Sequence, residues 1–550
     1  MSRLRVRFAL AILSLPVFAQ SPPTISVNTR LVQFSVVAHD KHGNPVADLT
    51  KDDFEIKDNG QLRPISVFVV ENSTSSSQSP QPPALPANVV RNRPTRSGTA
   101  PRNITVVLLD AYSTKVTDQM NMRQQMMRFF EEIYPGDRIA LYALTGGVSS
   151  GFRVLHDFTD NTHDLMEAVE KLMSSFSSAT EASDPVGANT GDDMMDSALD
   201  RAAYIDANFY TRMRAVNTSA AFIALAEHLN AIPGRKNVVW VSGGFPIDIG
   251  FGDPEDTKAE KQAMGGMAND QQIFTDYIQR ASLELNRANV SVYPVDVRGL
   301  KTLGMADASR NFKINRQTHQ LPQSATRVDQ RPVDTMKYIA DLTGGRAYYD
   351  RNDIDRAVRD AMDDSVVTYL IGYYLPEDSW DNRFHNIKVS VKRSGVHIRT
   401  KKGYLAQDLP APNDKQADDL LRQALWSPLD SAALSLTART DASNTKPGAT
   451  VFTYILDLSE LRLKEHDGKY EGKLDVVFAQ ENKRGQILAS VRKQLTLGLH
   501  PDTYQTLLQR GLGLSQEVEL NPAAGAVRII VLNRADGSTG SVTVPISGNP

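Results

Sequence analysis

The chain has 550 residues, and its 61 Lys and Arg residues nearly balance its 64 Asp and Glu residues, for a net charge of −3. At about 150 residues per domain, this length suggests three or four domains. A near-neutral chain lacks the basic surface that nucleic-acid binding needs, so we expect no nucleic-acid partner. The sequence contains no cysteine, which excludes thiol nucleophiles, disulfides, zinc–thiolate sites and lipid attachment at an N-terminal cysteine.

The first 19 residues have the pattern of a secretory signal peptide. Three arginines precede a short apolar run over residues 8–17, and the small residues Val17 and Ala19 fit a cleavage site before Gln20. The run is shorter than the roughly 20 residues that span a bilayer, and no later segment is long and apolar enough. We therefore expect an exported protein, periplasmic or extracellular, that is soluble after cleavage and has no transmembrane span.

Two strand-rich segments are expected to flank a central domain. Residues 24–72 contain apolar, β-branched runs separated by turn clusters, and residues 366–405 show the same pattern. Residues 73–100 are rich in Ser and Pro without apolar periodicity, which indicates a linker. Each segment is too small for a free sandwich, so we predict that 24–72 and 366–405 fold together, with the intervening domain inserted between them.

The pattern changes to alternating strands and helices over residues 101–365. Residues 104–109 form a nearly continuous apolar run, as expected for a strand buried on both faces, and residues 120–134 have the spacing of an amphipathic helix. Such alternation predicts a doubly wound α/β domain with a mostly parallel sheet. Residues 412–550 begin with a helix and continue as short strands between turns, which predicts a second β-sandwich.

The central segment resembles a von Willebrand factor type A (VWA) domain, and in particular the VWFA-related family known mainly from acidobacteria. The resemblance covers about residues 25–405. It is carried by residues 106–110 with Ser113 and Thr114, by residues 135–140, by the run PGRKNVVWVSGGFP at 233–246, by residues 292–300, and in the flanks by Val46, Leu49, Asp53, Phe54 and residues 369–374.

Domains of this family hold Mg²⁺ at the carboxyl ends of their central strands, in a metal-ion-dependent adhesion site that begins D-x-S-x-S. The resemblance implies that Asp110 matches the first Asp and Thr114 the last hydroxyl. Tyr112 stands at the middle Ser position and Ser113 lies one residue out of register. A degenerate site is therefore expected, with Mg²⁺ as its possible cofactor.

The remaining positions of the site are also altered. Ser242 replaces the later Asp, and the loop Thr is matched by Thr218 or Thr190. Asp296, at the end of a neighbouring strand, is a possible substitute carboxylate. Alternatively, Asp110 and Thr114 simply brace a strand-to-helix turn.

One further motif suggests catalysis. Residues 147–151 fit G-x-S-x-G, the nucleophile elbow, with Ser149 as the candidate nucleophile. That motif requires a helix after the serine, whereas residues 152–156 have the pattern of a strand, so a hairpin explains them better.

Three functions follow from these features. We expect a non-catalytic adhesion or scaffold protein that binds a protein partner. The alternatives are an exported serine hydrolase using Ser149, and a structural subunit of an envelope complex with a vestigial VWA site.

Overall fold

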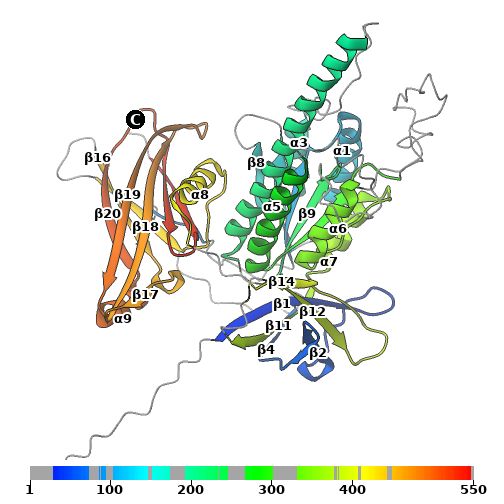
Figure 1. Ribbon diagram of the computed structural model, residues 1–550, viewed down its shortest axis with the longest axis horizontal. Helices are drawn as coiled ribbons and strands as arrows, with labels where there is room; N and C mark the ends of the chain where they lie inside the picture. Colours follow the sequence, from blue (N-terminus) through cyan, green and yellow to red (C-terminus); the bar gives the residue numbers. More distant parts are fainter. Residues whose placement is uncertain are drawn as a thin grey trace, which may run out of the picture.

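The computed structural model describes residues 29–72, 86, 88–93, 103–134, 136–145, 151–173, 193–232, 234–245, 267–300, 331–376, 381, 383–406, 411–442 and 449–546. The predicted signal peptide lies outside them. Their helices and strands form a mixed, sheet-rich structure with several separate sheets (Figure 1). Within this part of the chain, no helix is long and apolar enough to cross a membrane.

Residues 29–72 and 367–405 together build a two-sheet unit, at the bottom of Figure 1. One sheet has the order β13-β1-β11-β4 and the other β14-β12-β2-β3. Their alternating apolar residues meet between the sheets, where Val36, Ile56 and Tyr369 are fully buried. The strands are β1 (Thr29–His39), β2 (Phe54–Asp58), β3 (Gln61–Arg63), β4 (Val67–Asn72), β11 (Val367–Pro376), β12 (Phe384–Val391), β13 (His397–Arg399) and β14 (Gly403–Leu405).

The central unit contains a five-stranded sheet in the order β10-β9-β6-β7-β8. Four of its strands are parallel, and β8 runs antiparallel to β7 at one edge. The strands are β6 (Asn103–Asp110), β7 (Asp137–Leu144), β8 (Phe152–Thr159), β9 (Lys236–Ser242) and β10 (Val290–Asp296). Beyond β10, the segment 346–349 adds a single isolated bridge, between Tyr348 and Val295.

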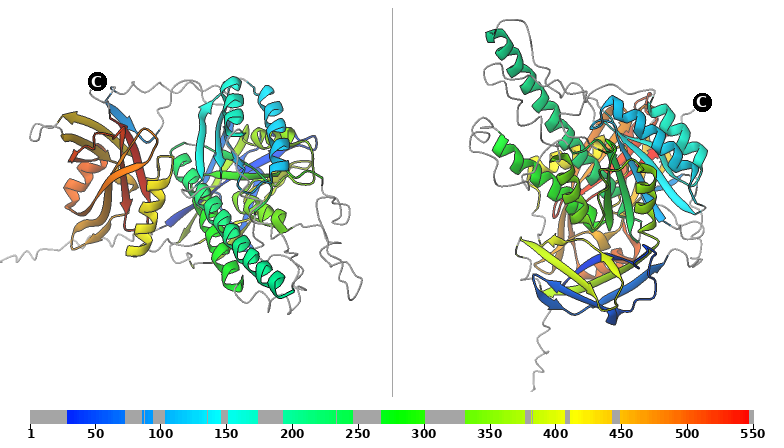
Figure 2. Two further views of the ribbon diagram at one scale, coloured as in Figure 1. Left: turned by 90° about the horizontal axis from the view of Figure 1, so that it is seen from above. Right: turned by 90° about the vertical axis from the view of Figure 1, so that its right-hand side faces the viewer.

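Helices cover both faces of this sheet (Figures 1 and 2). Because successive side chains of a strand point to opposite faces, Val106 and Leu108 pack against one helix layer and Val107 and Leu109 against the other. The first layer consists of α3 (Asp193–Leu229), α5 (Met267–Arg287) and α6 (Arg331–Thr343). The second consists of α1 (Val116–Glu131), α2 (Thr162–Met173) and α7 (Ile354–Asp363).

The C-terminal unit packs two further sheets around one apolar core, which includes Phe452 and Phe478. The first sheet has the order β20-β16-β15-β5 and the second the order β17-β18-β21-β22. The helix α8 (Asp414–Trp426) covers the outer face of the second sheet. The other elements of the C-terminal unit are β15 (Leu436–Ala442), β16 (Ala449–Leu456), β17 (Lys464–His466), β18 (Lys469–Glu481), β19 (Ile487–Leu499), α9 (Pro501–Arg510), β20 (Leu512–Glu519), β21 (Ala526–Asn533) and β22 (Thr539–Pro545).

Part of the segment expected to be a linker belongs to this C-terminal unit. The strand β5 (Val89–Arg91) pairs with β15 at the edge of the first sheet. Asn92 follows it and is buried, donating from its side-chain amide to the backbone oxygens of Ser431 and Leu434. The partner strand lies about 350 residues further along the chain, so local composition carries no signal for this pairing.

Candidate functional site

Three neighbouring parallel strands end together at one edge of the central sheet. In the strand register, Asp110 at the end of β6 lies opposite Ser242 at the end of β9, which in turn lies opposite Asp296 at the end of β10. In open α/β sheets, the carboxyl ends of such strands are the usual place for ligands. The structure therefore brings three of the polar residues singled out in the sequence to one edge.

The Asp110 carboxylate is fully buried, and protein donors occupy both of its oxygens. Oδ1 accepts the backbone N–H of Ser113 at 2.9 Å. Oδ2 accepts the Ser242 hydroxyl at 2.9 Å and the indole N–H of Trp240 at 3.1 Å. Burial raises the pKa of the Asp110 carboxyl above its ordinary value, and these hydrogen bonds oppose the rise.

The loop between β6 and α1 is held against the end of β9. The Thr114 hydroxyl donates to the Asp110 backbone oxygen at 2.5 Å and accepts the Gly243 N–H at 2.9 Å. A side chain at position 243 would put its Cβ 2.7 Å from the Ser113 oxygen, so this contact requires glycine. Gln119 donates to the backbone oxygens of Ala111 and Thr114 and fixes the loop from the helix side.

Two residues near this loop lie apart from the hydrogen-bond network. Tyr112, at the middle position of the expected motif, is buried in the core between the sheet and the α3 layer. Thr218 is also buried, but it lies inside the continuous helix α3 rather than on a loop. No hydrogen bond or contact joins Thr218 to Asp110 among the interactions of the described residues. The other candidate, Thr190, lies outside those residues.

Asp296 is committed to an ion pair. Its two carboxylate oxygens accept the Nε and Nη2 groups of Arg298 at 2.9 and 2.8 Å, a bidentate arrangement. Asp296 is fully buried, so the arginine neutralises a charge that water does not reach. This pairing counts against Asp296 as a substitute metal ligand.

The side chains at this edge, as arranged, do not fit Mg²⁺. The ion needs an octahedron of hard oxygens at about 2.1 Å. Here the Trp240 N–H and the Ser242 hydroxyl point their hydrogens at the one carboxylate that would bind it. Among the described residues, no group of three or more His, Asp or Glu side chains could hold a metal ion. Mg²⁺ binding by Asp110, Ser113, Thr114, Thr218 and Ser242 stays a prediction, and it requires this network to rearrange.

Exposed apolar side chains lie at the same edge. Val116 and Met120 are in the first turns of α1, with 39% and 69% of their surface exposed, and Leu300 follows β10 with 64% exposed. The side chain of Asn121 donates to the Val297 backbone oxygen at 3.2 Å, so the start of α1 lies beside the segment that follows β10. These exposed apolar side chains thus belong to the segments that follow β6 and β10, the two strands that end in Asp110 and Asp296.

The Ser149 motif lies mostly outside the described residues. The flanking residues close a hairpin, because Thr145 donates its backbone N–H to the Gly151 oxygen at 2.7 Å. The strand β8 begins at Phe152, so a strand and not a helix follows the motif. The local setting that a nucleophile elbow requires is therefore missing.

At the opposite edge of the sheet, the Arg-Lys pair of the PGRK run lies at the junction with the N-terminal sandwich, which it contacts through the Arg235 backbone. The Arg235 guanidinium is buried and donates to the Tyr293 hydroxyl at 2.9 Å and to the Gly344 oxygen at 2.8 Å. Its backbone N–H donates to Glu71 of β4 at 3.3 Å. The sequence marks this run as the most specific part of the resemblance but does not reveal this role.

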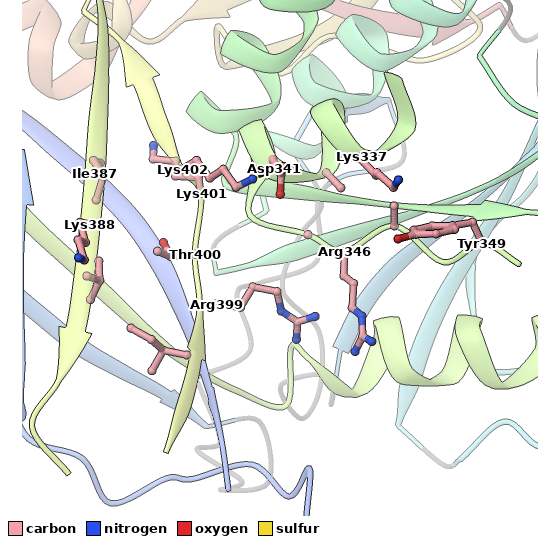
Figure 3. Close-up of a pocket in the computed structure, with 15 residues that line it drawn as sticks. Lys337, Asp341, Arg346, Tyr349, Ile387, Lys388, Arg399, Thr400, Lys401 and Lys402 are labelled. Atoms are coloured by element: carbon pink, nitrogen blue, oxygen red, sulfur yellow. Dashed lines mark hydrogen bonds and ion pairs between the residues drawn. The ribbon is translucent and has the colours of Figure 1, made fainter. Parts of the chain in front are cut away.

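A basic groove of about 570 Å³ lies at the same junction, between α6 and the strands β12 and β13 (Figure 3). Ion pairs neutralise much of its charge. Lys402 pairs with Asp341, Arg399 with Asp364 and Lys337 with Asp334. Arg346 and Lys388 also line the groove. The groove is therefore mainly a place where charged side chains of the two units pair with one another.

No family model and no curated sequence matches the chain. Among solved structures, a von Willebrand factor type A protein from Catenulispora acidiphila is 10% identical, with a TM-score of 0.22, over 90% of this chain and 74% of that one. Three N-terminal domains of the type V pili tip protein Mfa5 from Porphyromonas gingivalis are 8% identical, with a TM-score of 0.26, over 88% and 96%. Proximal thread matrix protein 1 from the mussel byssus is 9% identical, with a TM-score of 0.23, and the match spans about half of that protein (48%) and 48% of this one. Similarity at this level carries no argument about function.

Proposed function

We propose that this chain is an exported, non-catalytic protein that binds another protein through the carboxyl edge of a VWA-like domain. The observation that carries the proposal is the set of exposed apolar side chains Val116, Met120 and Leu300 around the Asp110 network. Burying apolar surface contributes about 25 cal/mol per Å², and exposed apolar groups with a polar surround are typical of protein interfaces.

The closed state of the Asp110 network supports binding without a metal bridge. In a metal-dependent adhesion site, the ion keeps an open position for a carboxylate of the partner. Here the carboxylate oxygens already accept three protein donors. We therefore propose that the network is a rigid support for the start of α1 and for the segment after β10, which carry the apolar side chains, and that Mg²⁺ has no part in binding.

A structural role in an envelope complex is the second candidate, and it uses the same surface. It differs in that the contact would be permanent and the partner would co-purify with the chain. The hydrolase alternative has no support from the described residues that flank Ser149, where Thr145 pairs with Gly151 and β8 runs antiparallel to β7.

The test is capture of surface and envelope proteins of the source organism on the immobilised protein. We expect binding that persists in EDTA and falls at least about tenfold in Met120→Lys and Leu300→Lys, because a charge at the centre of an apolar contact is strongly unfavourable. Leu62→Lys is the matched control, since Leu62 is equally exposed (64%) but lies on β3 of the sandwich.

Two results would overturn the proposal. One is equal loss of binding in the Leu62 control, which would show that added charge anywhere disrupts binding. The other is binding that disappears in EDTA and returns with Mg²⁺, which would show that the network opens to hold the ion.

A further inference from the structure

A polar cavity of about 240 Å³ lies where the amino ends of β9 and β10 meet the N-terminal sandwich. The central unit contributes the turn before β9, including Arg235 and Lys236, and the turn before β10, including Asn289. The sandwich contributes Gln33 of β1, Glu71 of β4 and, beyond β13, Lys401. The cavity thus lies between two units of the molecule, on the side of the sheet opposite to Asp110.

The lining is strongly cationic. Its positive side chains are Arg235, Lys236, Arg287 and Lys401, and Glu71 is its one carboxylate. Glu71 is already engaged, because it accepts the Arg235 backbone N–H at 3.3 Å and the Thr368 hydroxyl at 3.1 Å. The excess positive charge has no counterpart within the walls.

Two of these cations are themselves buried and poorly satisfied. Lys236 is 2% exposed and Lys401 is 7% exposed. An ammonium group has three N–H donors. Among the described residues, Lys236 Nζ donates to the Ile232 oxygen at 2.6 Å and Lys401 Nζ to the Gln33 oxygen at 3.1 Å, one acceptor each. Both acceptors belong to residues that line the cavity.

Of the other two cations, Arg287 has an ion-pair partner, whereas the buried Nε of Arg235 has no hydrogen-bond partner among the described residues. The Arg235 guanidinium donates to Tyr293 and Gly344, and Arg287 pairs with Glu284 at 3.2 Å. Burial lowers the pKa of Lys401 to about 8 and that of Lys236 to about 8, with Glu71 opposing the shift for Lys236. Glu71 partly offsets the Lys236 charge, whereas a cationic Lys401 is a buried charge that is costly unless an anion accompanies it.

We propose that this cavity binds a small tetrahedral oxyanion, phosphate or sulfate, whose charge is offset by the lysines that line it. Such an ion supplies several acceptor oxygens for the unfilled N–H donors and the negative charge that the walls lack. The cavity is much larger than the roughly 30 Å³ that one water occupies in the liquid, so the ion and bridging waters fit.

Isothermal titration calorimetry of the whole exported protein with sodium sulfate and with sodium phosphate tests the proposal. We expect saturable binding at pH 7 that weakens at least about tenfold in Lys401→Met and in Lys236→Met. Methionine keeps the length of the chain and removes a buried charge, so both variants should fold, which circular dichroism checks. Lys402→Met is the matched control, since Lys402 is the next residue, is exposed and pairs with Asp341.

The pH dependence separates an ion site from an ordinary water-filled cavity. Sulfate keeps its charge between pH 7 and pH 9, whereas Lys236 and Lys401 lose theirs, so sulfate binding should weaken over this interval. Phosphate in place of sulfate shows whether the site prefers one oxyanion. The proposal is overturned if neither ion binds, if Lys401→Met binds like the unchanged protein, or if sulfate binding is the same at pH 7 and pH 9.

Discussion

The two ends of the central parallel sheet bury charges of opposite sign. At the carboxyl end, one buried carboxylate, that of Asp110, is surrounded by neutral donors from Ser113, Trp240 and Ser242. At the amino end, Arg235, Lys236 and Lys401 gather around a cavity that contains a single engaged carboxylate. At the carboxyl end, the hydrogen-bond partners of the buried charge all belong to the central domain. At the amino end, the lining of the cavity includes residues of the neighbouring sandwich.

The comparison indicates that the amino end is attached to the rest of the molecule, whereas the carboxyl end faces outward. The amino end touches the sandwich through Glu71, and the C-terminal unit reaches the last turn of α3, where Ala432 donates to the Glu227 oxygen at 3.0 Å. The carboxyl end presents exposed apolar side chains. Three substitutions test whether the two ends of the sheet differ in this way.

The largest expected effect is at the amino end, in Arg235→Ala. The change removes two buried hydrogen bonds to Tyr293 and Gly344 and leaves a cavity, which should lower the free energy of unfolding by about 3 kcal/mol. Urea unfolding measures it. Arg287→Ala is the matched control, because its exposed ion pair should cost less than about 1 kcal/mol. Equal effects of the two changes would show that the buried hydrogen bonds of Arg235 add no more stability than an exposed ion pair.

A smaller effect is expected where the C-terminal unit meets α3. Burial, with the nearby Glu284 charge, raises the pKa of Glu227 to about 7, against hydrogen bonds from Thr539 and Ser431 and the charge of Arg280. A raised folded-state pKa gives stability that is full below the ordinary Glu value and is lost as the pH rises through about 7. The unfolding free energy should therefore fall by roughly 2 kcal/mol between pH 5 and pH 8.

Glu227→Gln provides the control for this dependence, because glutamine does not titrate and keeps the shape of the side chain. Its unfolding free energy should change less than that of the unchanged protein over the same interval. If the unfolding free energies of the two proteins depended on pH in the same way, a group other than Glu227 would be responsible for the pH dependence.

The smallest effect is expected at the carboxyl end, in Asp110→Asn. Asparagine presents one acceptor oxygen where the carboxylate presents two, which should cost about 1 kcal/mol near pH 4. Because burial raises the Asp110 pKa, the unchanged protein loses stability as the pH rises above the ordinary Asp value, and asparagine does not. The cost of the substitution should thus shrink toward pH 7, as thermal unfolding at several pH values measures. A cost that grows with pH would contradict this account of the network.

Strands and helices whose apolar residues recur at the regular spacing of that element could be predicted from the sequence. The apolar run at 104–109 corresponds to β6, whose side chains alternate between two helix layers, and the helical spacing after Met120 corresponds to α1, although that helix begins at Val116. The positions of Asp110 and Ser242 at strand ends follow from the same reasoning, since parallel strands end at one edge.

Contacts that depend on register or on distant segments could not be predicted. Trp240 donates to Asp110 because both residues point to the same face of adjacent strands, which only the pairing of β6 with β9 reveals. The partner of Lys401 is the backbone of Gln33, 368 residues earlier, and no sequence pattern encodes it. The strand β5 is equally hidden, because its three residues lie in a stretch whose composition is that of a linker.

The position of β5 also determines how the molecule would carry a pulling force. The chain leaves the sandwich after β4, contributes β5 to the C-terminal unit, and only then enters the central domain at β6. Besides its contact with α3, the C-terminal unit is attached at two points: the covalent connection that precedes α8, and the ladder of β5 on β15 with the buried Asn92 amide behind it. Tension on the far end of the chain is then shared between a backbone connection and a set of hydrogen bonds.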